Sequence, residues 1–179
     1  MNTLVISLII FGCIAIASVF LLGRYKRPLA ENVKVGDAAP VFTLPDETGT
    51  PRSLTEFKGK KIVLYFYPKD GTPGCTKEAC GLRDSFDQFK QHDIVVIGVS
   101  YDSPESHKNF KEQERLPFIL LSDTKHEVAH KYGTDQHALG NLYALRKSFL
   151  INEQGIIIFI LDNVTPETHA KDVLKSFGY

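Results

Sequence analysis

The sequence predicts a three-layer α/β sandwich that is preceded by a single transmembrane helix. Two patterns predict the sandwich: apolar runs of strand length alternate with segments of helical periodicity, and the chain ends with a hairpin and one more helix. A third pattern predicts the transmembrane helix, because residues 3–23 carry no charge and are long enough to cross a bilayer. The 179 residues, 43% of them hydrophobic and with no net charge, suffice for one domain with a sizeable core and give no reason to expect a nucleic acid partner.

The N-terminal pattern divides the chain into a membrane anchor at residues 1–23, a basic flank and tether at 24–36, and a folded domain at 37–179. Arg24, Lys26 and Arg27 directly follow the uncharged run, so the positive-inside rule places the domain on the cytoplasmic side of the membrane. A domain that faces outward is the alternative. A cleaved signal peptide would begin with basic residues and have a shorter apolar centre, so we expect the anchor to be retained.

The order of strands and helices follows from short apolar runs and capping residues. Strands are predicted where β-branched or aromatic runs are bounded by turn residues, at 41–44, 51–54, 62–67, 94–100, 118–121, 149–152 and 156–161. Helices are predicted where a capping residue precedes a periodic apolar face, at 72–89, 103–114, 126–132 and 165–177. D-E-T-G-T joins the first two strands and E-Q-G the last two, so each pair is expected to form a hairpin.

The stretch at residues 61–91 contains the residues with the clearest chemical meaning. Its buried strand ends at Pro68, which has no N–H for a β-ladder. Thr72 is predicted to be the N-cap of a helix with Pro73 in the first helical position. The helix has one apolar face, which is formed by Cys75, Ala79, Leu82, Phe86 and Phe89. Cys75 is therefore expected in the first turn of a helix, directly past the end of a buried strand.

A helix N-terminus favours a thiolate, but its effect alone is too small. Lowering a thiol pKa from about 8.5 to about 6 requires about 3.4 kcal/mol, whereas a helix N-terminus supplies about 0.3–1 kcal/mol, or about 2 kcal/mol when partly buried. We therefore expect a cation or a hydrogen-bond donor beside Cys75. Without further evidence, a single cysteine on an apolar helix face is more often a small buried hydrophobic residue.

Cys80 lies five residues after Cys75, which separates the two Cα atoms by about 8.6 Å on a continuous helix. A disulfide requires less than about 7 Å, so a bridge between them would need the first turns to unwind. The spacing does not favour zinc, because a structural zinc site needs a second ligand pair and the domain has no other cysteine. It also differs from the C-x-x-C of a thioredoxin-type redox site.

At residues 68–76, P-K-D-G-T-P-G-C-T matches the P-x-x-x-T-x-x-C signature of the peroxiredoxins, so the chain resembles that family. The extension T-P-G-C-T-x-E-A-C resembles the Q-type, or bacterioferritin-comigratory, branch, in which the resolving cysteine follows the peroxidatic cysteine by five residues. The resemblance extends over residues 33–179, with further matches at P-x-F-x-L-P-D (40–46), V-I-G-V-S (96–100), L-S-D (121–123) and R-K-S-F-L-I (146–151). It implies a thioredoxin fold with an N-terminal β-hairpin.

The activity that the resemblance implies is that of a thiol-dependent peroxidase acting on hydrogen peroxide and organic hydroperoxides. Cys75 would become a sulfenic acid, Cys80 would convert it to an intramolecular disulfide, and a thioredoxin-like protein would reduce that disulfide. No cofactor and no metal ion is implied. The expected partners are the hydroperoxide, the reductant and the membrane, through residues 3–23, and the chain is expected to be a monomer or a weak dimer.

Four further residues have roles that only the resemblance implies. Arg146 and Thr72 would donate hydrogen bonds to the thiolate and then to the peroxide. Pro68 would shield the sulfur from water. Glu78 would orient Arg146, although an exposed acid in the first helical turn is the alternative for Glu78. Arg83 is a weaker candidate for the cation.

Three alternatives compete with the peroxidase. Residues 126–130 fit the H-E-x-x-H pattern of a zinc protease, although Gly133 ends that helix before a third ligand. A membrane-tethered thiol–disulfide exchange protein would act on protein disulfides and ignore peroxide. A catalytically idle binding module would have a Cys75 that is alkylated no faster than an ordinary thiol. The remaining histidines are expected to be solvated; they are His92, His107, His137 and His169.

Overall fold

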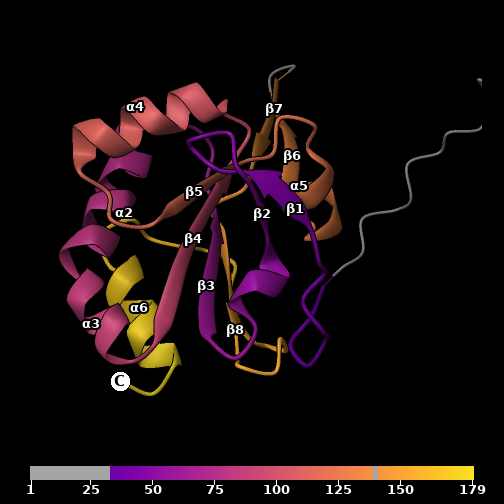
Figure 1. Cartoon of the computed structure of the whole chain (residues 1–179), viewed down its shortest axis with the longest axis vertical. Helices are drawn as coiled ribbons and strands as arrows, with labels where there is room; N and C mark the ends of the chain where they lie inside the picture. The colour runs from indigo at the N-terminus through magenta and orange to yellow at the C-terminus, as the bar shows by residue number, and fades with distance from the viewer. Residues whose placement is uncertain (1–32, 139–140) are drawn as a thin grey trace, which may run out of the picture.

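A five-stranded sheet forms the centre of the computed structural model, which describes residues 33–138 and 141–179 (Figure 1). In spatial order its strands are β5 (Ile119–Ser122), β4 (Ile94–Ser100), β3 (Lys61–Phe66), β8 (Lys147–Ile151) and β9 (Ile157–Leu161). β3 pairs in parallel with β4 and antiparallel with β8. Two short hairpins lie outside this sheet, β1 (Thr43–Pro45) with β2 (Pro51–Ser53) and β6 (Asp135–Ala138) with β7 (Asn141–Ala144).

Helices cover both faces of the sheet. They are the 3-10 helix η1 (Leu54–Phe57) and the α-helices α2 (Pro73–Asp84), α3 (Phe86–Gln91), α4 (Pro104–Glu114), α5 (Glu127–Lys131) and α6 (His169–Ser176). α2, α3, α4 and α6 pack on one face, whereas α5, η1 and the β1–β2 hairpin pack on the other (Figure 1). The predicted three-layer α/β sandwich with an N-terminal hairpin is confirmed.

β3 is the central strand, and every side chain in it after Lys61 is buried. Successive residues of a strand face opposite sides of the sheet. The side chains at 62, 64 and 66 therefore enter one hydrophobic core with Val128 of α5, and those at 63 and 65 enter the other with Leu82 of α2. Both faces of β3 are covered, which explains why its sequence is a continuous apolar run rather than an alternating one.

Three elements differ from the prediction. The helix that starts at Pro73 ends at Asp84, and α3 follows after Ser85, although the apolar periodicity continues to Phe89 across the break. The last helix begins at His169 rather than at 165, because residues 165–168 form a turn closed by a hydrogen bond from the Thr168 N–H to the Thr165 carbonyl oxygen. The β6–β7 hairpin was not predicted, since its sequence shows no alternation of apolar and polar residues.

The prediction of a transmembrane helix is corrected. Residues 3–23 lie outside the described residues, and no helix within 33–138 or 141–179 is long and apolar enough to cross a membrane. The longest described helix, α2, has 12 residues, whereas a membrane span needs about 20. Over the described residues the fold class is therefore the α/β sandwich, and the transmembrane helix is not supported. The expected location on the cytoplasmic side of a membrane, which depended on that helix, is withdrawn with it.

The first described residues join the β8–β9 end of the sheet. The Gly36 N–H donates to the Ile157 carbonyl oxygen at 2.8 Å, and the Ala39 N–H donates to the Gly155 carbonyl oxygen at 2.9 Å. Ala38 and Ile156 form an isolated antiparallel bridge between the same two segments. The division of the chain at residue 37 stays a prediction.

Candidate active site

The start of α2 lies directly past the end of β3, as predicted. The Tyr67 N–H still donates to the Val99 carbonyl oxygen at 3.1 Å, and Pro68 then ends the pairing. Gly71 adopts a left-handed backbone with φ of 66° in the loop that follows. Thr72 is extended and Pro73 is the first helical residue. This local order puts Cys75 in the first turn of α2.

Cys75 is buried and lies against a guanidinium. Only 2% of the residue is exposed, and its neighbours in the core include Tyr65, Ala79 and Leu82. Arg146 Nη2 donates a hydrogen bond to the Cys75 sulfur at 3.3 Å. The expected cation beside the thiol is therefore present, and it is Arg146.

The sheet explains how Arg146 reaches this place. β8 runs antiparallel to β3, and Lys147 at its start pairs with Phe66 at the end of β3. Arg146 thus lies beside the loop that leads into α2, far from Cys75 in sequence but adjacent in space. Burial lowers the pKa of Arg146, but Glu78 and Cys75 outweigh burial and leave that pKa above its ordinary value.

Gly74 provides the space that the guanidinium occupies. A Cβ atom at position 74 would lie 3.2 Å from Arg146 Nη2. This is closer than an ordinary van der Waals contact, so a larger residue would crowd the arginine. The sequence motif contains this glycine, but only the structure shows what it makes room for.

Glu78 is fully buried, so the alternative of an exposed first-turn acid is wrong. Arg146 Nη1 donates to Glu78 Oε2. The other carboxylate oxygen, Oε1, lies 3.0 Å from Nδ1 of His169, whose Nε2 lies 2.9 Å from Ser148 Oγ. The expectation that His169 is solvated is wrong, since its side chain is completely buried. The sequence offered one signal for this, because His169 precedes buried Val173 by four residues and so shares its helix face.

Thr72 and Pro68 lie in the loop before α2. Thr72 does not cap the helix with its side chain; its hydroxyl donates instead to the Lys69 carbonyl oxygen at 3.0 Å. Its predicted role as a second donor to Cys75 would require the hydroxyl to turn away from Lys69. Pro68 is half-buried directly after the buried end of β3.

Cys80 lies on the side of α2 that faces the end of α4. Its thiol donates to Glu114 Oε2 at 3.4 Å, and burial together with this carboxylate raises the pKa of Cys80. Both cysteines are free. They lie on one unbroken helix, whose geometry separates their Cα atoms by about 8.6 Å, so a bridge between them requires the helix to open.

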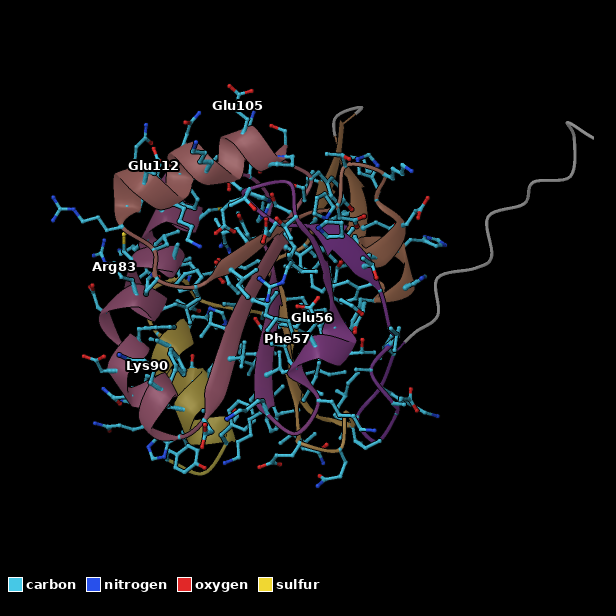
Figure 2. All side chains as sticks on the ribbon, viewed as in Figure 1. Glu56, Phe57, Arg83, Lys90, Glu105 and Glu112 are labelled. Atoms are coloured by element: carbon cyan, nitrogen blue, oxygen red, sulfur yellow. The ribbon has the colours of Figure 1, made fainter. Side chains whose placement is uncertain are left out.

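Arg83, the weaker candidate for the cation, contacts other groups. Its Nη1 donates to the Glu114 carbonyl oxygen at 2.7 Å, and its Nε donates to Asp84 at 2.9 Å. Figure 2 shows Arg83 at the outer flank of α2, beside the end of α4. The structure therefore brings Arg146, and not Arg83, to the Cys75 sulfur.

The H-E-x-x-H segment does not form a zinc site within the described residues. His126 precedes the short helix α5 with φ of 60°, and its ring packs against Tyr101 at 4.1 Å between centroids. His130 Nδ1 lies 3.1 Å from Asp135 Oδ2. Across residues 33–138 and 141–179, no group of three or more metal-ligating side chains could hold a metal ion.

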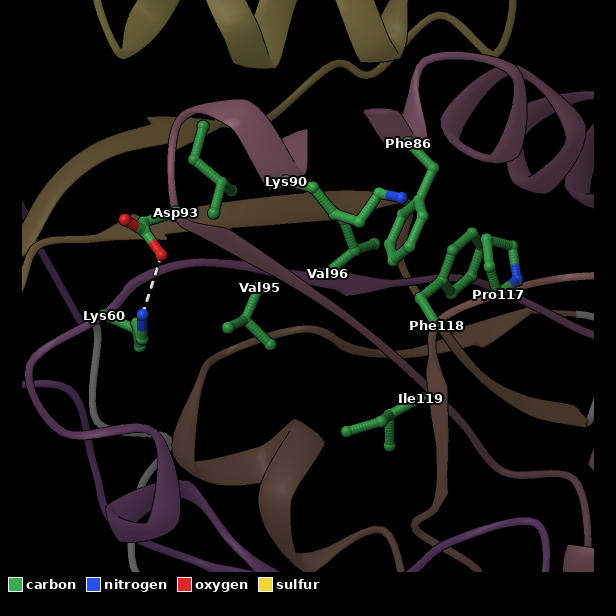
Figure 3. A pocket seen from close by; sticks show the side chains of 10 residues that line it. Lys60, Phe86, Lys90, Asp93, Val95, Val96, Pro117, Phe118 and Ile119 are labelled. Carbon is green, nitrogen blue, oxygen red and sulfur yellow. Dashed lines mark hydrogen bonds and ion pairs between the residues drawn. The ribbon is translucent and has the colours of Figure 1, made fainter. Parts of the chain in front are cut away.

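A cavity of about 290 Å³ lies between α3 and the starts of β4 and β5 (Figure 3). Phe86, Val96 and Phe118 line it, and Lys60 forms an ion pair with Asp93 at its rim, 2.7 Å apart. β4 is parallel to β3, so its start is at the opposite end of the sheet from Cys75. This cavity is therefore separate from the candidate site.

Comparisons with known proteins agree with this geometry. The model of the AhpC/TSA family matches residues 35–160. A peroxiredoxin of the bcp type from Coxiella burnetii is 46% identical over 147 residues, which are 80% of this chain and 97% of that protein. The chloroplastic peroxiredoxin Q of Sedum lineare is 42% identical over 151 residues, covering 84% of this chain and 81% of that protein.

Solved structures share the fold. The crystal structure of the peroxidoxin BcpB from Mycobacterium tuberculosis has a TM-score of 0.75 and 35% identity, and the match covers 80% of this chain and 96% of that chain. The bacterioferritin comigratory protein of Xanthomonas campestris has a TM-score of 0.72 and 29% identity over 78% of this chain and 96% of that chain. The thioredoxin fold that the resemblance implied is confirmed.

Fold and site together define a thiol-dependent peroxidase with a thioredoxin fold. The chain belongs to the AhpC/TSA family, whose members named above are peroxiredoxins. Within that family the relatives and structures named above are of the Q type, or bacterioferritin-comigratory type, as the motif around Cys75 predicted. The names of several plant relatives assign those proteins to the chloroplast.

Proposed function

We propose that Cys75 is the peroxidatic nucleophile of this thiol-dependent peroxidase, that Cys80 is its resolving cysteine, and that Arg146 is the donor that activates both sulfur and peroxide. The observation that carries the proposal is the hydrogen bond of 3.3 Å from Arg146 Nη2 to the Cys75 sulfur in the first turn of α2. This bond and the helix N-terminus both favour negative charge on that sulfur.

In the first step the Cys75 thiolate attacks the nearer oxygen of the hydroperoxide. An S–O bond forms and the O–O bond breaks, so sulfur is oxidised to a sulfenic acid and the second oxygen leaves as water or an alcohol after it takes up a proton. Arg146 is charged and lies against the sulfur, so it can stabilise the charge that develops on the leaving oxygen. A site whose cysteine residue is only 2% exposed favours a slim peroxide over a protein disulfide, which argues against the thiol–disulfide exchange protein.

In the second step α2 unwinds near its start and Cys80 reaches the sulfenic acid. An S–S bond forms, the S–O bond breaks and water leaves. A thioredoxin-like dithiol then reduces the Cys75–Cys80 disulfide, which returns both thiols and allows α2 to refold. The proposal requires no cofactor and no metal ion.

The finer details of the reaction are proposed on similar grounds. Alkyl peroxide reduction activity is attributed to the bacterioferritin comigratory protein of Xanthomonas campestris, so we expect organic hydroperoxides as substrates besides hydrogen peroxide. Thr72 would act as a second donor and Pro68 as a shield at the sulfur. We also propose that the folded domain spans residues 37–179 and that the protein is a monomer or a weak dimer.

The test is peroxide consumption by the full chain with a thioredoxin system as the reductant. Wild type should turn over repeatedly, and Cys75→Ser should consume no peroxide. Cys80→Ser should react once and then stop, with Cys75 labelled by dimedone as a sulfenic acid. Continued peroxide consumption by Cys75→Ser would overturn the proposal.

A further inference from the structure

The Glu78 carboxylate is the most deeply buried charge beside the Cys75 sulfur, with no exposed surface on its side chain. Burying a carboxylate is costly unless both oxygens have partners. Arg146 Nη1 donates to Oε2, and His169 Nδ1 lies 3.0 Å from Oε1. Within the described part of the chain, neither Oε1 nor Nδ1 has a hydrogen-bond partner, so the ion-pair contact between them is the polar contact on which both atoms rely. Each of these two atoms therefore depends on the other.

The ring of His169 is held from three sides. Nδ1 faces Glu78, Nε2 lies 2.9 Å from Ser148 Oγ, and the Tyr65 ring packs edge-on with 5.8 Å between the centroids. A carboxylate can only accept a hydrogen bond, so Nδ1 carries the proton that faces Glu78. Nε2 is then free to accept from the Ser148 hydroxyl. The ring thus bonds to Ser148 through Nε2 and keeps Nδ1 within ion-pair distance of Glu78, although the Nδ1–Oε1 contact does not have the alignment of a hydrogen bond.

We propose that His169 is a positioning residue of the peroxidase: it holds the Glu78 carboxylate so that Arg146 keeps its second guanidinium nitrogen against the Cys75 sulfur. The inference rests on the proposed role of Cys75 as the nucleophile. A guanidinium is planar and rigid, so the bond from Nη1 to Glu78 determines where Nη2 points. His169 acts on the sulfur only through these two residues.

The same contact connects the last helix to the reactive one. His169 is the first residue of α6, and α6 packs against α2, which carries both Glu78 and Cys75. If His169 only filled space between these helices, a leucine of similar size would replace it without loss of reactivity. If it positions Glu78, the N–H is required and the shape alone is not enough.

The test compares His169→Leu, which removes both ring nitrogens, with His169→Asn, which keeps an N–H donor near the Nδ1 position. The measurement is the rate constant for Cys75 sulfenic acid formation by hydrogen peroxide in the reduced full chain, with dimedone quenching and mass spectrometry. We expect His169→Leu to be slower by about tenfold or more, because small misplacements of a catalytic group have effects of this size. His169→Asn should regain most of the rate.

A double-mutant cycle separates positioning from packing. In a Glu78→Gln background, His169→Leu should cause no further loss, because the carboxylate through which His169 acts is already gone. His92→Leu is the matched control: it makes the same change at a histidine that stacks on Tyr179 directly before the start of β4, at the opposite end of the sheet from Cys75, and should leave the rate unchanged. If His169→Leu does not fold, the cycle is run with His169→Ala.

Three results would overturn the inference: a folded His169→Leu that reacts at the wild-type rate, equal losses in His169→Leu and His169→Asn, or losses that multiply in the Glu78→Gln background. Each of these three results leaves the proposed function intact, because in each of them the wild type still forms the sulfenic acid on Cys75. A wild type that forms no sulfenic acid on Cys75 would instead refute the proposed function itself.

Discussion

At the scale of single residues, Arg146 serves two acceptors with one guanidinium. Nη2 donates to the Cys75 sulfur at 3.3 Å and Nη1 donates to Glu78. A lysine in its place would carry the same charge, but its ammonium group is a single point and cannot hold both acceptors in fixed directions. The site therefore depends on the fork shape of arginine as well as on its charge.

Arg146→Lys is expected to lower the rate constant of the reduced chain with hydrogen peroxide by about 10²–10³, the usual effect of losing one donor aimed at developing charge. Stopped-flow oxidation measures this step directly. Arg83→Lys makes the same change at an arginine that contacts Glu114 and Asp84 instead of Cys75, so its rate for this step should equal that of wild type. A near-wild-type rate for Arg146→Lys would show that the site does not need the two directed donors of the guanidinium.

Gly74 and Gly81 both lie on α2 and allow a matched comparison. A Cβ atom at Gly74 would lie 3.2 Å from Arg146 Nη2, whereas at Gly81 it would meet only the Pro166 carbonyl oxygen at 3.8 Å. Gly74→Ala should displace the guanidinium and slow sulfenic acid formation by about tenfold. Gly81→Ala should leave the guanidinium in place and the rate unchanged, although both variants gain about 1 kcal/mol of helix propensity. Equal rates in the two variants, measured by stopped flow, would contradict this reading of Gly74.

At the scale of the helix, α2 keeps the two cysteines apart and also restrains Cys80. The Cys80 thiol donates to the Glu114 carboxylate of α4 at 3.4 Å. Burial and this negative charge raise the pKa of Cys80, so the folded helix holds it in the thiol form. Because the attacking form is the thiolate, unwinding of α2 would free Cys80 from Glu114 as well as bring it to Cys75.

The pH dependence of Cys80 alkylation tests this restraint. In a Cys75→Ser background, labelling by iodoacetamide should rise with a midpoint above that of an ordinary thiol, because a raised pKa leaves less thiolate at any given pH. Glu114→Gln should move the midpoint down, although burial keeps part of the shift. Glu112→Gln, an exposed change on the same helix (Figure 2), should not move it. Identical midpoints in all three proteins would contradict the role of Glu114.

How much the sequence could predict also differs between elements. The start of α2 was predictable because Pro68, Thr72 and Pro73 act locally on the backbone. The end of α2 was not, since the apolar spacing runs on through α3 and only tertiary packing sets the break at Ser85. Residues 135–138 and 141–144 have no periodic pattern, so their pairing was not visible in the sequence.

The residues of the candidate site also differ in whether the sequence alone could predict them. Cys75, Cys80 and the need for a cation followed from local spacing and from the size of the helix effect. Arg146 was placed beside Cys75 only by resemblance, because strand pairing far along the chain brings it there. His169 was missed for a physical reason: a polar residue is buried only when partners satisfy it, and Glu78 and Ser148 come from two other elements.

At the scale of the whole molecule, the loop before α2 is held by α4, which starts more than thirty residues later. Asp70 Oδ1 accepts from the Tyr67 hydroxyl at 2.7 Å, and Oδ2 accepts from the Ser106 hydroxyl at 2.8 Å and lies 2.9 Å from His107 Nδ1. The Asp70 N–H donates to Asp102 Oδ2 at 2.9 Å. The expectation that His107 is solvated is wrong, because it is completely buried in this network.

This network predicts how the stability of the fold depends on pH. Burial raises the pKa of Asp70, but hydrogen bonds from His107, Tyr67 and Ser106 outweigh burial and leave that pKa below its ordinary value. A carboxyl group with a lowered folded pKa stabilises the fold above its unfolded pKa, which is about 3.9, and loses this contribution as the pH falls through the folded pKa. The stabilisation by Asp70 should therefore be complete at neutral pH and disappear below about pH 4.

Urea unfolding at a series of pH values checks the prediction with Asp70→Asn. Wild type should exceed Asp70→Asn in free energy of unfolding at pH 6, and the difference should shrink as the pH falls below about 4. Asp87→Asn is the control, because Asp87 forms an exposed pair with Lys90 and such pairs contribute about 0–1 kcal/mol. A difference between wild type and Asp70→Asn that stays constant down to the lowest pH would mean that the charge on Asp70 does not hold the loop to α4. Position 70 would then stabilise the loop through its shape and neutral hydrogen bonds alone.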